Sequence, residues 1–383
     1  MTTKNLEQMR HEIDDIDAQI TDLFKQRMET SVEIAKYKSE NKVPVLNDRR
    51  EKEILHTISE RIGEPYDGYA RLLFNTIFDA SKSCQNNYLA RKSDLADRIE
   101  TALEETPKLF PKKAVVACQG VAGSYSQAAC ERLFEVPSIM FFNSFEGVFN
   151  AVDKGLCRYG ILPIENSSYG SVGAVYDLMQ NYNFHIVRGI RQKISHNLMA
   201  KAGTKLSDVR EIFSHEQAIG QCGEFLKTLK NVKVTVCENT ALAAKMVAES
   251  DRNDIAAISS KECLDLYGLE LLKKHIQISD NNYTRFICIS KKMEIYPGSD
   301  KISLILSLPH VPRALYQTIA KFAALGINLT KLESRPIPGS NFEFMFYFDL
   351  EASVYSPELI NLLSVMENQP DTFVFLGCYT EMI

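Results

Sequence analysis

The stretch LEQMRHEIDDIDAQITDLFKQRMETSVEIAKYK, residues 6–38, predicts one long helix near the start of the chain. Its apolar residues recur mostly at steps of three and four, which aligns them along one stripe of an α-helix. The stripe consists of Leu6, Met9, Ile13, Ile16, Ile20, Phe24, Met28 and Ala35. Pro44 marks a break, and two further helices are expected at 48–62 and 66–90. Three such helices make a poor closed bundle, so we expect a second copy of the chain to cover the stripe.

From Ala114 the pattern changes to short apolar runs that alternate with helical stretches. The strands expected from these runs are 114–118, 159–164, 232–237, 254–259 and 285–290. This alternation is typical of an α/β domain with largely parallel strands, which bind ligands at the carboxyl ends of the strands. The polar segment 91–112, which contains Pro107 and Pro111, is expected to be a linker.

A second linker, with Pro297 and Gly298, precedes a segment in which the order of elements differs. The expected order is strand 301–308, helix 312–325, strand 327–334, strand 342–350, helix 356–367 and strand 371–379. This βαββαβ order predicts a ferredoxin-like unit. The sequence therefore predicts a multidomain protein, with domains at 1–90, 113–291 and 300–383.

The composition excludes several classes of protein. The 383 residues are 45% hydrophobic and 24% charged, as in soluble globular proteins, and the net charge of −5 argues against a general nucleic-acid binder. An anionic substrate would therefore need local cationic groups. No apolar run approaches the ~20 residues of a membrane span, and the polar start lacks a signal-peptide pattern. The nine cysteines contain no C-x-x-C pair, which favours reduced thiols and a cytoplasmic location. The seven dispersed histidines offer no metal-ligand spacing, so we expect neither a metal ion nor another cofactor.

Helix geometry relates the cationic residues of the first segment. Arg27 and Lys38 are eleven residues apart, hence ~16 Å apart along the axis and within ~20° on one face. Arg10 precedes Arg27 by seventeen residues, which separates the two by ~26 Å and ~100°. If all three bind one small molecule, Arg10 must come from another subunit. The alternative is that each side chain lies on a solvated helix face.

Glycines and hydroxyl residues mark the start of the α/β segment. The motif Gly120-Val121-Ala122-Gly123-Ser124 follows an apolar strand and opens a helix, where backbone N–H groups can bind an anion. A tight turn that requires glycine is the alternative. Three pairs have the spacing of a helix capping box: Ser124 with Gln127, Ser214 with Gln217, and Asp48 with Glu51.

Four segments together carry a family resemblance: GVAGSYSQ at 120–127, PIENS at 163–167, NYTRF at 282–286 and LESRP at 332–336. They resemble the prephenate dehydratase family with its C-terminal regulatory ACT domain, and the residues ahead of them resemble the all-helical class of chorismate mutase. The resemblance implies an intertwined helical domain, a two-lobed α/β domain and a ferredoxin-like ACT domain. Because the two reactions are consecutive steps toward phenylalanine, it also implies a bifunctional homo-oligomeric enzyme. Its substrates would be chorismate and prephenate, and its effector phenylalanine.

The mutase resemblance assigns a role to each polar residue of one pocket. By this resemblance, Arg27 and Arg10 from a second subunit bind the two substrate carboxylates. Lys38 and Gln85 contact the ether oxygen, and Glu51 contacts the hydroxyl. Arg50 and Ser81 complete the pocket wall. Asn47 stands where the family usually has an aspartate. The rearrangement needs no nucleophile, so such a pocket supplies a compact substrate conformer and hydrogen-bond donors.

The dehydratase resemblance covers Glu165, Asn166, Ser167, Ser214, His215, Gln217, Thr284, Arg285 and Phe286. Thr284 matches the family's essential hydroxyl and is expected to assist departure of the ring hydroxyl; the alternative is a strand-end threonine bonded to backbone. Arg285 is expected either to bind a carboxylate or to form a structural salt bridge, and Phe286 to form pocket wall or core. Glu216 replaces the proline usual between His215 and Gln217.

The ACT resemblance rests on Glu333, Ser334, Arg335 and Pro336, which match the family's motif at the phenylalanine-binding dimer interface. The companion Gly-Ala-Leu motif appears here as Arg313, Ala314 and Leu315. Because glycine permits close backbone approach, Arg313 is expected to weaken effector binding. The alternative is an ACT fold retained for dimerisation alone.

Two other functions stay open from the sequence. One is a dehydratase that takes arogenate in place of prephenate. The other is a phenylalanine-sensing binding protein whose helical domain only dimerises, and the presence of Lys38, Gln85 and Thr284 argues against it.

Overall fold

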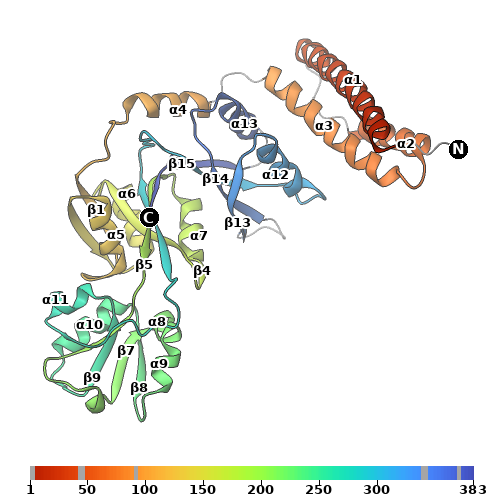
Figure 1. The fold of residues 1–383 in the computed structure, drawn as a ribbon. Helices are drawn as coiled ribbons and strands as arrows, with labels where there is room; N and C mark the ends of the chain where they lie inside the picture. Colours follow the sequence, from red (N-terminus) through yellow and green to blue (C-terminus); the bar gives the residue numbers. More distant parts are fainter. Residues whose placement is uncertain (1–4, 42–47, 90–93, 338–343, 369–371) are drawn as a thin grey trace. The chain divides into compact units, whose positions relative to one another are not determined.

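The computed structural model describes residues 5–41, 48–89, 94–337, 344–368 and 372–383 (Figure 1). The contacts within this described part divide it into two compact units. The helical unit consists of the residues up to Asp97, Pro309–Gly326 and Tyr355–Phe373. The α/β unit consists of Arg98–Leu308, Ile327–Val354 and Val374–Ile383.

The helical unit begins with the long helix that the sequence predicts. α1 runs Leu6–Glu40 and starts in a capping box, in which Asn5 accepts from the Gln8 N–H at 2.8 Å and Gln8 from the Asn5 N–H at 3.1 Å. The other helices of this unit are α2 (Asp48–Ile62), α3 (Asp67–Leu89), α12 (Ala314–Ala324) and α13 (Pro357–Glu367). Apolar side chains along one side of α1 are more than half exposed: Leu6, Ile13, Ile16, Ile20 and Leu23. Neither α1 nor any other described helix is both long and apolar enough to cross a membrane.

The segment expected to be a linker contains a helix, so that expectation is wrong. α4 covers Asp94–Glu105, and its Leu95, Ile99 and Ala102 are at most 4% exposed. These three residues follow one another at steps of four and three, which forms a buried stripe in an otherwise polar segment. The prolines that suggested a linker lie beyond the end of α4. Glu367 of α13 accepts a hydrogen bond from the Leu95 N–H at 2.9 Å.

The first lobe of the α/β unit is built on a seven-stranded sheet within the described residues. Its order is β16-β5-β11-β3-β1-β2, and β4 pairs with β3. The strands are β1 (Lys113–Gln119), β2 (Val136–Phe142), β3 (Tyr159–Asn166), β4 (Gly170–Ser171), β5 (His185–Lys193), β11 (Tyr283–Ser290) and β16 (Glu381–Met382). α5 (Tyr125–Leu133) packs on one face, and α6 (Phe145–Asp153) and α7 (Gly173–Asn181) pack on the other.

The second lobe has a smaller sheet of order β10-β6-β9-β7-β8. Its strands are β6 (Asn197–Ala200), β7 (Glu211–His215), β8 (Lys233–Cys237), β9 (Ile255–Ser259) and β10 (Glu270–Lys273). Its helices are α8 (Glu216–Gln221), α9 (Gly223–Lys227), α10 (Thr240–Glu249) and α11 (Glu262–Tyr267). Figure 1 shows this lobe, in green, below the first.

The expectation of largely parallel strands is only partly correct. β1 pairs in parallel with β2 and β3, and β7 with β8 and β9. β11, however, is antiparallel to β3 and β5, and β6 is antiparallel to β9 and β10. The reason is topological: the chain leaves the first lobe after β5, builds the second lobe, and returns through β11 from the opposite direction.

A third sheet follows, formed by β12 (Lys301–Ser307), β13 (Asn328–Pro336), β14 (Phe344–Glu351) and β15 (Phe373–Tyr379) in the order β13-β14-β12-β15. We call it the C-terminal sheet. Its Ile305, Tyr347 and Leu376 join the core formed by α6, α7 and the first lobe. The Tyr347 hydroxyl also donates to the Tyr176 carbonyl of α7 at 2.6 Å. The C-terminal sheet therefore packs directly on one face of the first lobe.

Candidate active sites

A cavity of about 610 Å³ lies between the two lobes. It is lined at the carboxyl ends of β1, β3, β7 and β8, and the lining residues there are Gln119, Asn166, His215 and Glu238. This placement agrees with the expectation that a ligand binds at strand carboxyl ends. We call this cavity the cleft.

Helix N-termini, not cationic side chains, are the positively polarised groups at the cleft. No lysine or arginine is among its described lining residues, which corrects the expectation of local cationic groups. The N-termini of α5, α7 and α10 open onto it through Ser124, Gly173 and Asn239. Each N-terminus carries the equivalent of about half a positive charge. Together they can attract a dianion without a side-chain counter-ion.

The glycine-containing loop before α5 connects the two lobes. Gly123 has φ +84°, and a Cβ there would lie 2.7 Å from the Cys263 Sγ of the second lobe. Across the same contact, the Ser260 hydroxyl donates to the Gly123 carbonyl at 3.1 Å and the Tyr267 hydroxyl to the Ala122 carbonyl at 2.7 Å. The interpretation of this motif as a tight turn that requires glycine is therefore supported. The turn places Ser124 in the cleft.

Thr284 faces the cleft with its hydroxyl proton available. The Asn166 carboxamide oxygen accepts from the backbone N–H groups of Ser168 at 2.9 Å and Tyr169 at 3.1 Å, so its Nδ2 must face the other way. That Nδ2 donates to the Thr284 Oγ1 at 2.9 Å and to the Asn282 Oδ1 at 3.0 Å. Because Thr284 accepts from Asn166, its own O–H is left to donate into the cleft.

A second series of hydrogen bonds reaches the cleft through residues that were not predicted. The Gln221 Oε1 accepts from the Asn282 Nδ2 at 2.8 Å and lies 2.6 Å from the His196 Nε2, so this Nε2 carries the proton. The His196 Nδ1 is a buried acceptor without a partner in the described residues. Burial also lowers the pKa of His196, so the ring is neutral at pH 7. An isolated histidine and glutamine give no spacing signal by which sequence reasoning could have found them.

The Ser214-His215-x-Gln217 segment divides between core and cleft. Ser214 is fully buried and donates to the Ile258 carbonyl at 2.7 Å, so it forms no capping box with Gln217 and does not line the cleft. His215 caps α8 in its place, and its Nδ1 accepts from the Gln217 N–H at 3.3 Å. Burial lowers the pKa of His215 as well. His215 and Gln217 both line the cleft. Glu216 occupies the first position of α8, where proline is also favoured, so this substitution preserves the helix start.

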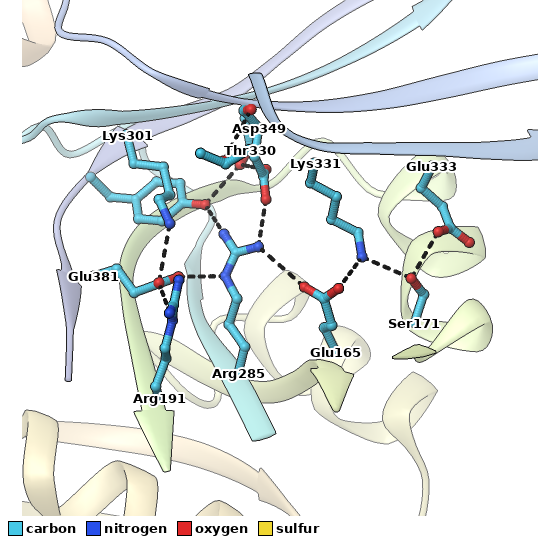
Figure 2. Close-up of polar contacts among 12 residues, drawn as sticks. Glu165, Ser171, Arg191, Arg285, Lys301, Thr330, Lys331, Glu333, Asp349 and Glu381 are labelled. Atoms are coloured by element: carbon cyan, nitrogen blue, oxygen red, sulfur yellow. Dashed lines mark hydrogen bonds and ion pairs between the residues drawn. The ribbon is translucent and has the colours of Figure 1, made fainter. Parts of the chain in front are cut away.

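Arg285 lies on the opposite face of β11 from Thr284 and Phe286, as alternation along a strand requires. Its guanidinium pairs with Asp349 and Glu381 at 2.5 Å each, which supports the structural salt bridge rather than a substrate carboxylate. Glu165 also faces away from the cleft and pairs with the Lys331 Nζ at 2.8 Å (Figure 2). Ser167 accepts from the Tyr283 N–H at 3.0 Å and donates to the Asn281 carbonyl at 3.1 Å.

Arg27 of α1 and Ser81 of α3 meet in the helical unit. The Ser81 hydroxyl donates to the Ile77 carbonyl at 2.8 Å, so its oxygen accepts from the Arg27 guanidinium. Burial lowers the pKa of Arg27, which nonetheless stays charged at pH 7. One turn beyond Ser81, Gln85 is 7% exposed and its Oε1 has no partner in the described residues.

The other residues of the mutase resemblance are more dispersed. Glu51 of α2 pairs with the Lys82 Nζ at 3.2 Å, a partner that was not predicted. Arg50 is exposed and lies 3.5 Å from Glu53. Arg10 is exposed on α1, and Lys38 is half-buried near its end. The call for Asn47 falls outside the described residues.

Arg313 adopts a backbone conformation that glycine would adopt freely. It precedes α12 with φ +77°, a left-handed conformation that costs a non-glycine residue ~1 kcal/mol. Its Nη2 lies 3.8 Å from the Asp79 carboxylate of α3, to which the Gln317 Nε2 donates twice, at 3.0 and 3.1 Å. Ala314 and Leu315 begin α12 and are half-buried.

The segment Glu333–Pro336, which the family resemblance links to effector binding, lies on β13, where side chains alternate between two faces. Glu333 accepts from the Ser171 hydroxyl at 2.8 Å, and Arg335 binds both oxygens of Asp177 at 3.0 and 2.7 Å. Ser334 and Pro336 are exposed on the alternate face.

Comparison with known proteins gives matches over both units. The chorismate mutase type II family model matches residues 9–86, and the prephenate dehydratase family model matches residues 116–294. A relative from Arabidopsis thaliana, arogenate dehydratase/prephenate dehydratase 2, is 36% identical and aligns with 69% of this chain and 72% of its own. The structure of prephenate dehydratase from Arthrobacter aurescens in complex with L-Phe superimposes with a TM-score of 0.63 at 27% identity, covering 70% of this chain and 89% of its own.

These matches define a mutase-type helical segment joined to a dehydratase-type α/β segment. One relative contains both: the bifunctional chorismate mutase/prephenate dehydratase of Escherichia coli is 30% identical, and the alignment covers 99% of this chain and 97% of the relative. The chain belongs to the bifunctional chorismate mutase/prephenate dehydratase family.

Proposed function

We propose that the chain rearranges chorismate to prephenate in its helical domain and converts prephenate to phenylpyruvate in the cleft. The observation that carries the second activity is the Asn166–Thr284 pair, which directs a hydroxyl proton into a cleft surrounded by helix N-termini. Domains at 1–90, 113–291 and 300–383 remain the proposed organisation. Incubation of the purified protein with chorismate tests the proposal: prephenate should appear first and phenylpyruvate later. Absence of both products would refute it.

The cleft suits the chemistry of prephenate. This dianion must lose carbon dioxide and its ring hydroxyl, and the aromatic ring that forms supplies the driving force. The hydroxyl leaves as water, so it must gain a proton. Thr284 is placed to donate toward that oxygen because its acceptor side is occupied by Asn166. The N-termini of α5, α7 and α10 supply the field that holds the two carboxylates.

Arogenate is a second candidate substrate, because Glu238 lines the cleft. Arogenate carries an ammonium group where prephenate carries a keto group, and a carboxylate is a natural partner for an ammonium. We expect Glu238→Gln to lower kcat/KM for arogenate by about tenfold, the size of one lost charge-assisted hydrogen bond, and to leave kcat/KM for prephenate nearly unchanged. Parallel assays of both substrates with both proteins measure this. Equal losses for the two substrates would remove Glu238 from substrate selection.

The helical domain is proposed to act as an intertwined homodimer. Its exposed stripe of Leu6, Ile13, Ile16, Ile20 and Leu23 is an apolar surface that a second copy would cover. Within one subunit, Arg27, which donates to Ser81, then binds a substrate carboxylate. The buried Gln85 makes a polar contact with the substrate. Arg10 is proposed to complete the neighbouring site, with Lys38, Glu51 and Arg50 in the roles that the family resemblance assigns.

The C-terminal segment is proposed to be a ferredoxin-like ACT domain that binds phenylalanine. Its elements follow the order β12-α12-β13-β14-α13-β15, and its sheet order β13-β14-β12-β15 is that of a ferredoxin-like unit. The related dehydratase from Arthrobacter aurescens was solved in complex with L-Phe. The proposed contacts are the motif residues Glu333, Ser334, Arg335 and Pro336 together with Arg313, Ala314 and Leu315.

Glycine at position 313 is expected to raise sensitivity to phenylalanine. Arg313→Gly relieves the strain of the left-handed backbone and removes the side chain from the motif. The phenylalanine concentration that inhibits the dehydratase by half should therefore fall severalfold. Arg313→Ala is the matched control, since it removes the side chain but keeps the backbone penalty. Titration of dehydratase activity with phenylalanine measures all three proteins. Weaker inhibition of the glycine variant than of the natural protein would contradict the prediction.

A cytoplasmic location is proposed from the cysteines. All nine are free thiols, and most of them are buried. Reduced thiols persist in the cytosol.

A further inference from the structure

A buried charged cluster lies on the face of β11 that points away from the cleft, around Arg285 (Figure 2). Arg285 is 8% exposed and is surrounded by groups from the C-terminal sheet and the chain end. Its Nη1 contacts the Asp349 Oδ2 at 2.5 Å, its Nε contacts the Glu381 Oε2 at 2.5 Å, and its Nη2 donates to the Tyr379 hydroxyl at 2.6 Å. This guanidinium therefore joins the first lobe to the C-terminal sheet, in addition to contacts such as Glu165 with Lys331 and Tyr176 with Tyr347.

The hydrogen bonds of this cluster form a closed ring with a defined direction. The Ser303 hydroxyl donates to the Asp349 Oδ1 at 2.5 Å, so the Tyr379 hydroxyl must donate to the Ser303 oxygen, from which it lies 2.7 Å away. Tyr379 in turn accepts from Arg285, and Arg285 returns to Asp349. The Ser303 and Tyr379 hydroxyls each donate one hydrogen bond and accept another, and Arg285 donates to both Tyr379 and Asp349, which orients the guanidinium.

Asp349 is the carboxylate that the C-terminal sheet contributes to the cluster. It lies on β14, which pairs with β12 on one side and β13 on the other. Its backbone carbonyl also accepts from the Thr330 hydroxyl at 3.2 Å. Asp349 thus lies on an interior strand whose pairing with β12 is regular and whose pairing with β13 shifts register between Leu329 and Lys331. It ties Arg285 to that strand.

The pairing of β11 is irregular on its β3 side where Arg285 leaves the strand. The pairing of β11 with β3 shifts register between Arg285 and Phe286, so the ladder is locally interrupted there. Thr284 is the residue just before this irregularity, and its hydroxyl is in contact with Asn166 of β3. On its other side β11 keeps an unbroken ladder with β5 at these residues. On the β3 side, where the ladder is interrupted, the ion pairs of Arg285 are an additional restraint on the strand.

We propose that Asp349 is a positioning residue for the dehydratase, which acts through Arg285 to hold the Thr284 hydroxyl at the leaving group. The C-terminal sheet is then part of the catalytic support even when no effector is bound. This inference rests on the proposed dehydratase function of the cleft.

The test compares Asp349→Asn with Glu351→Gln in the full-length protein, without phenylalanine. Glu351 lies two residues further on β14, is exposed, and contacts Asn328 at 2.7 Å, so it is a matched carboxylate outside the cluster. Asp349→Asn should lower dehydratase kcat about tenfold or more with KM changed less than about twofold, because a small misplacement of a reacting group affects turnover rather than binding. Glu351→Gln should retain kcat. Mutase activity of each sample reports the amount of folded protein.

A double variant shows whether Asp349 acts through Arg285. Combined with Arg285→Lys, the Asp349→Asn change should lower kcat no further than Arg285→Lys alone. Natural-level kcat in Asp349→Asn, an equal loss in the Glu351 control, or additive losses in the double variant would each overturn the inference.

If Asp349→Asn does not fold, Tyr379→Phe replaces it. We then expect about a threefold loss of kcat, and an unchanged kcat would count against the inference. A natural protein that does not convert prephenate would refute the proposed function itself.

Discussion

Replacement of Thr284 by valine is expected to lower dehydratase turnover by ~10²-fold or more while mutase turnover persists. Valine keeps the shape of threonine but has no hydroxyl, so the leaving oxygen loses its donor. The Asn166 Nδ2 also loses the acceptor that now lies 2.9 Å away. Phenylpyruvate formation from prephenate measures the first effect, and prephenate formation from chorismate measures the second.

Thr284→Ser is the matched control, because it retains the hydroxyl and loses only a methyl group. Its turnover should stay within about tenfold of the natural protein. Near-normal phenylpyruvate formation by the valine variant would show that the hydroxyl has no part in the reaction.

An Arg10→Ala chain and a Lys38→Ala chain should each be inactive as a mutase and should regain activity when their subunits exchange. Both residues lie on the 35-residue α1, and 28 residues of helix separate them by ~42 Å, too far for one small substrate. A mixed dimer therefore holds one site with both lesions and one site with neither. Random exchange should restore about a quarter of natural mutase activity, since half of the dimers are mixed and each has one intact site.

Each variant mixed with itself is the control for this experiment, and dehydratase activity confirms that the chains are folded. Proven subunit exchange without recovered mutase activity would mean that Arg10 serves its own chain or has no role in the reaction.

Elements with one strong local pattern were predictable from the sequence. The stripe of α1 is periodic over its whole length, and its observed bounds differ from the expected 6–38 by two residues at the end. α4 was missed because its stripe of Leu95, Ile99 and Ala102 is short and is followed by prolines. The antiparallel direction of β11 could not be predicted, since it depends on where the chain returns from the second lobe and not on the composition of the strand.

The residues of the candidate site likewise divide into those that stand in a local motif and those that do not. Thr284, Asn166 and His215 stand in short motifs, and each lines the cleft. His196 and Gln221 reach it only through the fold, so no local pattern marks them. Arg285 was grouped with its neighbours in one motif, although strand alternation puts every second side chain on the other face. Applying that alternation to the motif would have predicted the separation of Arg285 from Thr284.

The packing of the C-terminal sheet limits how this enzyme can be engineered. Ile305, Tyr347 and Leu376 complete a core of the first lobe, so a chain shortened before β12 would expose that core to water and lose solubility. A chimera with a foreign sensor would need apolar residues at the same three places. The proposed phenylalanine site is therefore better altered by point substitution at Glu333–Pro336 and Arg313–Leu315 than by truncation.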